Sequence, residues 1–116
     1  MRALAVLLVL GCTPALALTP AAQEFLEISK TLEPVQCEKR QLRRAMALAH
    51  VEQRGEDMKK LQLRFNTLNK DPKTAKMEKR LGELERRILD GSGKARDPQD
   101  LEAISLQQRQ AFYRCE

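Results

Sequence analysis

Two cysteines, Cys37 and Cys115, lie 78 residues apart in a chain whose other features indicate helices, and their pairing constrains the fold more than any other feature. No stretch alternates apolar and polar residues over the length of a β-strand, and glycine and proline are confined to a few short segments. We therefore predict an all-α chain. If the two cysteines form a disulfide, helices from distant parts of the sequence must meet.

The first 17 residues have the features of a secretory signal peptide. Arg2 precedes an uncharged apolar run, and Ala15-Leu16-Ala17 supplies the small residues that a signal peptidase recognises. We predict cleavage after Ala17, which leaves a single mature domain of residues 18–116. Loss of Arg2 lowers the formal net charge from +5 to +4. The mature chain has no apolar run of the about 20 residues that span a bilayer, so no transmembrane span is expected.

A second processing route competes with this one, because Val9-Leu10-Gly11-Cys12 resembles a bacterial lipobox. Cys12 would then be lipidated and become the first residue of an envelope lipoprotein. Either route takes Cys12 out of the disulfide question and exports the chain, with the bacterial periplasm as the expected compartment. Disulfides persist in such an oxidising compartment, so we predict a Cys37–Cys115 bridge, which stabilises the fold by about 4 kcal/mol.

Helix signals divide the mature chain into four segments. Thr19-Pro20 starts a short helix that should end near Leu32, because Pro34 disfavours helical backbone at the residue before it. The longest helical pattern covers residues 35–68, with a narrow apolar stripe of the kind that faces one or two partner helices. Gly55 costs about 1 kcal/mol inside a helix, so a break near it is the alternative.

Two further helices are predicted over residues 74–89 and 98–114, after turns rich in Asn, Asp, Gly and Pro. At 1.5 Å per residue, the 35–68 helix is about 51 Å long, residues 74–89 span about 24 Å and residues 98–115 span about 27 Å. Laid end to end, these two helices match the long one, which returns Cys115 to Cys37.

We therefore predict a long antiparallel helical hairpin clasped at its open end by the Cys37–Cys115 disulfide, with the short N-terminal helix packed on the clasped end. The chain has three Phe, one Tyr and no Trp, so its core must be thin, and a covalent clasp is a common remedy in small domains. The alternative is a compact bundle of three or four helices, in which the long helix breaks near Gly55.

The residues needed for catalysis or metal binding are scattered along the sequence. His50 is the only histidine and has no second ligand at helical spacing, and cysteines in a disulfide cannot bind zinc. No serine sits in a recognisable nucleophile motif, and Gly91-Ser92-Gly93-Lys94 lacks the strand and glycine spacing of a phosphate-binding loop. We predict that the protein is not an enzyme and holds no metal or cofactor.

A dense basic cluster follows Cys37 and consists of Lys39, Arg40, Arg43 and Arg44. Basic and acidic residues alternate along the predicted helices, which is typical of a solvated helix face. The alternative is a docking face for an acidic partner, either a protein or an anionic envelope surface. Nucleic acid is not expected as a partner, because the aromatic residues that stack on bases are nearly absent.

The narrow apolar stripe on long charged helices predicts an exported, non-enzymatic protein that binds a protein partner, or a second copy of itself, through a helix face. One alternative is a holdase-like periplasmic chaperone or an inhibitor of a secreted enzyme. Another is a lipoprotein or membrane-surface component anchored at Cys12.

Overall fold

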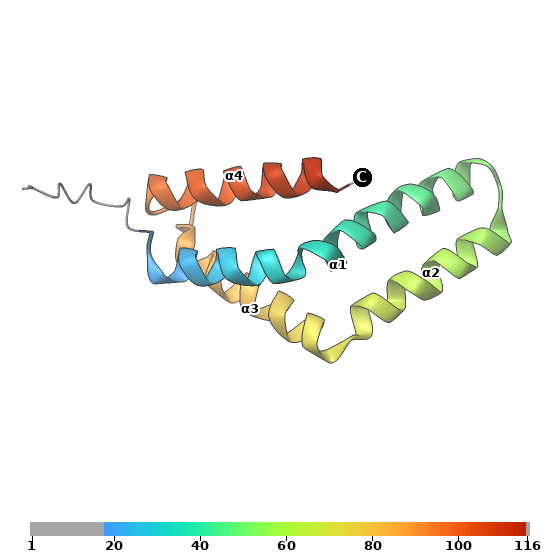
Figure 1. The fold of residues 1–116 in the computed structure, drawn as a ribbon, viewed down its shortest axis with the longest axis horizontal. Helices are drawn as coiled ribbons and strands as arrows, with labels where there is room; N and C mark the ends of the chain where they lie inside the picture. Colours follow the sequence, from blue (N-terminus) through green and yellow to red (C-terminus); the bar gives the residue numbers. More distant parts are fainter. Residues whose placement is uncertain (1–17, 116) are drawn as a thin grey trace, which may run out of the picture.

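The computed structural model describes residues 18–115, which form four helices in an elongated arrangement (Figure 1). The helices are α1 (Pro20–Val51), α2 (Gly55–Lys70), α3 (Pro72–Ile88) and α4 (Pro98–Arg114). The prediction of an all-α fold is confirmed. The predicted signal peptide, its cleavage after Ala17 and the lipidation of Cys12 lie outside the described residues.

A side-chain cap and a proline start three of the four helices. Thr19, Asp71 and Asp97 each accept a hydrogen bond from a backbone N–H in the helical turn that follows. Each is also followed directly by proline, at a position where the missing N–H breaks no helical hydrogen bond. Asp71 both ends α2 and caps α3, so these two helices follow each other without a loop.

The first helix continues through Pro34, so the prediction of a separate short helix that ends near Leu32 is wrong. Proline removes one helical hydrogen bond, and Figure 1 shows α1 changing direction near its middle. α3 and α4 pack along the first half of α1, and α2 packs along its second half. These contacts hold helical backbone on both sides of the proline, because tertiary packing supplies most of the stability of a helix.

The long helix predicted over residues 35–68 is interrupted by a turn at residues 52–54, where the chain reverses direction. This is the break that the alternative prediction placed near Gly55. Gly55 itself is the first residue of α2 rather than part of the turn. The position of the break was therefore predicted within a few residues, but the residue that makes the turn was not.

Hydrogen bonds of a Schellman motif end α1. The N–H of Arg54 donates to the carbonyl of Ala49 at 2.8 Å, and this bond spans the last helical turn. The N–H of Gln53 donates to the carbonyl of His50 at 3.1 Å. Gln53 has a φ of 56°, in the left-handed region that glycine adopts most easily. The sequence conceals this turn because glutamine occupies a position where glycine is usual.

Together, α2 and α3 run back along the full length of α1. The 32 residues of α1 measure about 48 Å, and the 16 and 17 residues of α2 and α3 together measure about 50 Å. We had assigned the returning arm to residues 74–89 and 98–114, and that assignment is wrong. The arm is one helix earlier in the sequence, because the chain reverses at residues 52–54 rather than at Asp71.

The last helix, α4, lies parallel to the first half of α1 in a constant register. Three pairs of hydrogen-bonded residues link the two helices, and the partners in every pair are 81 residues apart. Successive pairs are one heptad apart on both helices, as in a parallel coiled coil. The pairs are Thr19 with Asp100, Leu26 with Gln107 and Glu33 with Arg114.

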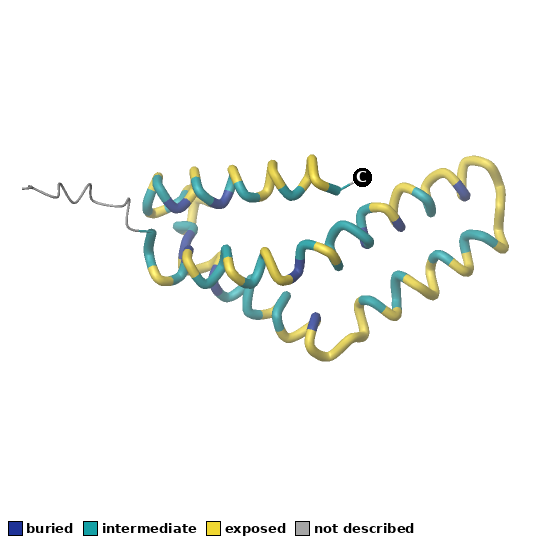
Figure 2. Tube along the Cα trace, in the orientation of Figure 1, coloured by how far each residue is buried: buried dark blue, intermediate teal, exposed yellow. Residues whose placement is uncertain are grey.

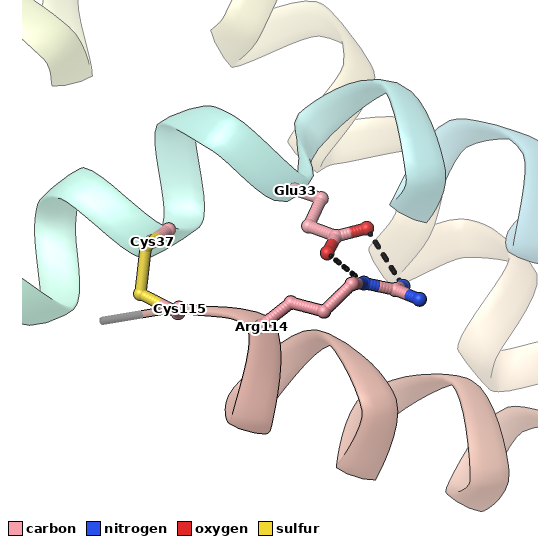
Figure 3. Close-up of a disulfide and its surroundings, with 4 residues drawn as sticks. All are labelled: Glu33, Cys37, Arg114 and Cys115. Atoms are coloured by element: carbon pink, nitrogen blue, oxygen red, sulfur yellow. Dashed lines mark hydrogen bonds and ion pairs between the residues drawn. A yellow bond between two sulfur atoms is a disulfide. The ribbon is translucent and has the colours of Figure 1, made fainter.

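The predicted disulfide between Cys37 and Cys115 is present, with 5.5 Å between the two Cα atoms. It joins the middle of α1 to the residue that follows α4. The bridge therefore fastens α4 to α1. The prediction that it closes the open end of the hairpin is wrong. Figure 3 shows the bridge beside the ion pair between Glu33 and Arg114.

The core lies at the end of the molecule where α1, α3 and α4 meet. Its buried residues are Ala22, Leu84, Ile88 and Ile104, and residues near the start of α1 pack against them. The second half of α1 and α2 project from this end as a two-helix stem, in which α2 has no buried residue (Figure 2). Among the described residues, none of the helices combines the length and the apolar character needed to cross a membrane.

Candidate functional site

The predicted basic cluster lies on α1 directly after Cys37, and its first member is not available for docking. Lys39 is only 6% exposed, and its Nζ atom lies 2.6 Å from a carboxylate oxygen of Glu78 on α3. A buried ammonium must be paired, and Glu78 provides the pairing. Lys39 therefore joins α1 to α3.

Two arginines of the cluster rest on aromatic rings of two other helices. The guanidinium carbon of Arg40 lies 5.8 Å from the ring centre of Phe112 on α4. The corresponding distance from Arg43 to Phe65 on α2 is 5.4 Å. Both are cation–π contacts, which hold the guanidinium group in place without neutralising its charge.

The four basic residues therefore do not form one exposed docking face. Lys39, Arg40 and Arg43 point to three different helices, and one turn of α1 thus contacts the whole remainder of the fold. Of the four side chains, Arg43 and Arg44 are exposed, whereas Arg40 is half-buried. The sequence pattern could not separate these cases, because burial depends on which helices surround α1.

A polar cleft of about 490 Å³ opens where α1, α2 and α3 meet, and we call it the junction cleft. Its charged lining consists of the three cations just described and one carboxylate, that of Glu78. Since Lys39 pairs with Glu78, neither arginine has a carboxylate partner within residues 18–115. The remaining lining residues are Gln36, Phe65 and Asn69.

A second hollow is lined mainly by α1 and α4, and α3 contributes Leu81 to its larger part and Glu85 and Ile88 to its smaller part. The larger part of this hollow measures about 630 Å³, and a smaller part of about 170 Å³ shares Phe25, Ser105 and Gln108 with it. We call the two parts together the α3/α4 groove. Its apolar lining residues are Phe25, Leu81, Ile88, Leu89, Leu101, Ile104, Ala111 and Phe112.

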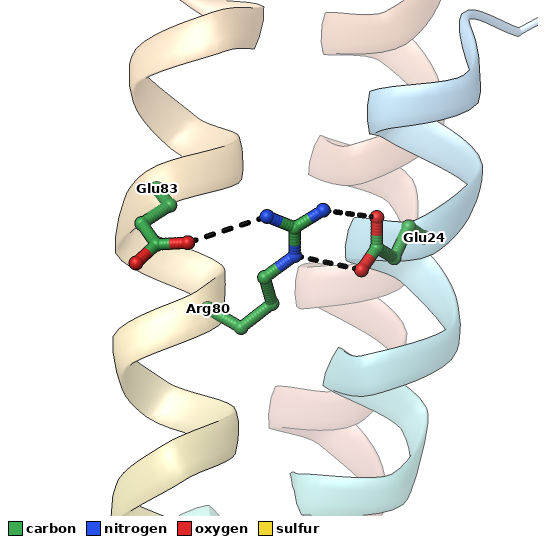
Figure 4. Close-up of polar contacts among 3 residues, drawn as sticks. All are labelled: Glu24, Arg80 and Glu83. Atoms are coloured by element: carbon green, nitrogen blue, oxygen red, sulfur yellow. Dashed lines mark hydrogen bonds and ion pairs between the residues drawn. The ribbon is translucent and has the colours of Figure 1, made fainter.

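Bidentate ion pairs fix the two helices that form the walls of this groove. Arg80 of α3 binds Glu24 of α1 through two nitrogens at 2.8 and 2.9 Å and also reaches Glu83 (Figure 4). On the other wall, Arg114 of α4 binds Glu33 of α1 at 2.9 and 3.2 Å. Hydrogen bonds from these guanidinium groups hold the pKa of both α1 carboxyls below the ordinary value of 4.5.

Asp100 is a structural residue that the sequence analysis missed. Its side chain is 2% exposed, and it accepts hydrogen bonds from the N–H and the hydroxyl of Thr19 at 3.1 and 2.5 Å. A buried carboxylate needs such donors, and here they come from the residue that caps α1. The position of Asp100 was one signal in the sequence, since acidic residues favour the first turn of a helix. Its partner Thr19, 81 residues away, could not be predicted from the sequence.

Within residues 18–115, no group of three or more His, Cys, Asp or Glu side chains lies together as metal ligands do. His50 is exposed near the end of α1. Ser92 is bound within its own loop, where its hydroxyl donates to the carboxylate of Asp90 at 2.6 Å.

Comparisons of the chain with protein-family models, with curated proteins and with solved structures were made, and none of the three finds a match.

Proposed function

We propose that this chain is an exported, non-enzymatic binding protein whose α3/α4 groove receives an amphipathic helix from a protein partner. The groove itself is the observation that supports the proposal. It runs between two helices held apart on α1, and its apolar side chains include Phe112 and Leu101, which are 48% and 49% exposed. A partly apolar groove on a covalently fastened frame is suited to helix-in-groove recognition.

The shape and charge of the groove favour a helix as its occupant. A helix bound in the groove beside α1 and α4 would complete a four-helix arrangement with α1, α3 and α4. At the end near the disulfide, the groove is lined by Arg40 and Arg109, whereas Glu33 is already bound by Arg114. We therefore expect the partner helix to carry an acidic residue at that end.

Export is part of the same proposal. Leu18 would be the first residue after cleavage, and it packs against the core, while Thr19 binds Asp100. Cleavage after Ala17 would thus retain every residue that these contacts need. Intact mass of the protein from its native envelope tests the proposal: a chain starting at Leu18 supports periplasmic release, and a lipid on Cys12 supports a membrane-anchored form instead.

Site-specific photo-crosslinking in native cells tests the groove. A photoreactive residue at Gln108, which lines both parts of the groove, should give one defined adduct. The matched control is Gln110, which is exposed on the same helix but lies outside the groove lining. Filling the groove with Ser105→Trp should abolish the adduct without loss of helicity by circular dichroism.

The crosslinking results distinguish a protein partner in the groove from a homodimer and from binding outside the groove. An adduct with another protein that forms only at Gln108 supports the proposal, and an adduct of twice the chain mass would show a homodimer. Equal crosslinking at Gln110, or an adduct that persists in Ser105→Trp, would refute the groove as the binding site.

A second candidate function, a holdase or a self-associating protein, is favoured by the stem. Leu48, Val51 and Leu63 are 52%, 78% and 68% exposed there. Surface leucines are common singly, but three on a two-helix stem offer sites for unfolded clients or a second copy. Suppression of client aggregation that is lost in Leu63→Glu and kept in Ser105→Trp would favour this function over the first.

A further inference from the structure

The lining of the junction cleft carries more positive than negative charges. Lys39, Arg40 and Arg43 line it, and Glu78 is the one carboxylate in the lining. Because Lys39 and Glu78 form an ion pair, neither guanidinium group of the cleft pairs with a carboxylate among residues 18–115, although the charge of Arg40 acts on Glu33. Arg40 and Arg43 rest on rings of different helices, but both line the cleft, and its net positive charge favours a bound anion.

A buried hydrogen-bond donor without an acceptor also favours an anion in this cleft. The Nε atom of Arg40 is buried and has no acceptor in the structure. A buried donor without a partner is destabilising, and native proteins commonly satisfy such a donor with a ligand or an ion. Arg40 is also held in place, because its guanidinium group rests on Phe112.

The rest of the lining supplies donors suited to an oxyanion. Arg43 is positioned on Phe65, which leaves the edge of its guanidinium group to bind other groups. The side-chain amides of Gln36 and Asn69 line the same cleft and can donate further hydrogen bonds. Arginine forks and amide N–H groups are the donors that bind phosphoryl oxygens.

We propose that the junction cleft binds a phosphoryl group, whose negative charge would offset the charges of Arg40 and Arg43. A cleft of about 490 Å³ accommodates this group and leaves it open to solvent on one side. The group can be free inorganic phosphate or the phosphate of an anionic envelope lipid. Arg40 lines both this cleft and the α3/α4 groove, whereas Arg43 and Asn69 line the cleft and not the groove, so variants of these two residues test the phosphoryl site separately from the partner helix.

Thermal unfolding of the oxidised mature protein in inorganic phosphate tests the site. Ionic strength is held constant with sodium chloride, so that screening does not change. We expect a Tm that rises with the logarithm of the phosphate concentration above the Kd, by about 7 °C at ten times the Kd. In parallel, NMR should show shifts of the Arg40 and Arg43 Nε–H signals and of the side-chain amides of Gln36 and Asn69.

Matched variants separate a built site from general attraction. Arg43→Gln removes one cation of the cleft, and Arg86→Gln removes an exposed cation of α3 outside it. Binding should be lost in the first and kept in the second. If Arg43→Gln disturbs the fold, Asn69→Ala replaces it, because Asn69 is exposed at the end of α2 and should weaken binding severalfold. Equal loss in the Arg43 and Arg86 variants, or unchanged Arg40 and Arg43 signals, would overturn the proposal.

Vesicle flotation then identifies the source of the phosphoryl group. Vesicles of phosphatidylglycerol and phosphatidylcholine that bind the Arg86→Gln protein but not the Arg43→Gln protein would assign the site to a lipid headgroup. Phosphate binding without vesicle binding would assign it to the free anion. Vesicle binding that both variants weaken alike would overturn the lipid as the ligand of the cleft.

Discussion

Replacing Gln53 with glycine should stabilise the protein, which is an unusual expectation for glycine in a helical chain. Gln53 has a φ of 56° in the Schellman turn that ends α1. The left-handed conformation costs an L-residue about 1–2 kcal/mol, and glycine avoids this cost. Glycine in turn raises the conformational entropy of the unfolded chain, which offsets about 0.5–1 kcal/mol. The net gain should be about 0.5–1 kcal/mol, or a Tm increase of about 4 °C.

The same substitution has the opposite sign if α1 and α2 form one continuous helix. Glycine would then lie in a helix interior and lower the stability by about 1 kcal/mol. The control is Gln53→Ala, because alanine also pays the energetic cost of the left-handed conformation. This substitution should change the stability little in a turn, but should stabilise a continuous helix. Urea unfolding of the oxidised protein, followed by circular dichroism, measures all three proteins. A loss of stability in Gln53→Gly together with a gain in Gln53→Ala would refute the turn.

Three further predictions concern the contacts that hold α3 and α4 on α1. Cys115→Ser should lower the Tm by more than about 15 °C, since the closed loop is worth about 4 kcal/mol, and a scan that matches the oxidised wild type would contradict this. Asp100→Ala should destabilise by about 1–3 kcal/mol because it leaves the Thr19 donors unpaired, and combining it with Thr19→Ala should cost less than the sum. The lowered pKa values of Glu24 and Glu33 mean that their ion pairs stabilise the fold above about pH 4.5. This contribution is lost as the pH falls through the folded-state pKa values, so acid unfolding of Arg114→Gln should show a shallower pH dependence than that of the wild type.

The sequence predicted the parts of the fold that depend on local signals. The caps Thr19 and Asp97, the all-α class and the pairing of the two cysteines follow from rules that involve a few neighbouring residues or a compartment. It failed at Pro34 and Gln53, where tertiary contacts override the local preference of the residue. Because of these two errors, the arms of the hairpin were predicted one helix too late in the sequence.

The candidate sites were harder to predict than the fold. Lys39 and Arg44 belong to one basic cluster in the sequence, yet one is buried and the other is exposed. The two side chains differ in exposure because α3 covers one side of α1 and leaves another side open. The α3/α4 groove depends on the distance between two helices, which no spacing of residues within either helix reveals.

The constant register between α1 and α4 has a consequence for the order in which the chain assembles. α1 and α2 are joined by a three-residue turn, so they can pair early, and α3 follows directly. The partners on α4 are 81 residues away, and contacts across so much chain form late. Cys37 therefore remains a reactive thiol until α4 has docked. We therefore expect the native disulfide to form last and a crosslink between the Cys37 residues of two incomplete chains to be the main folding error.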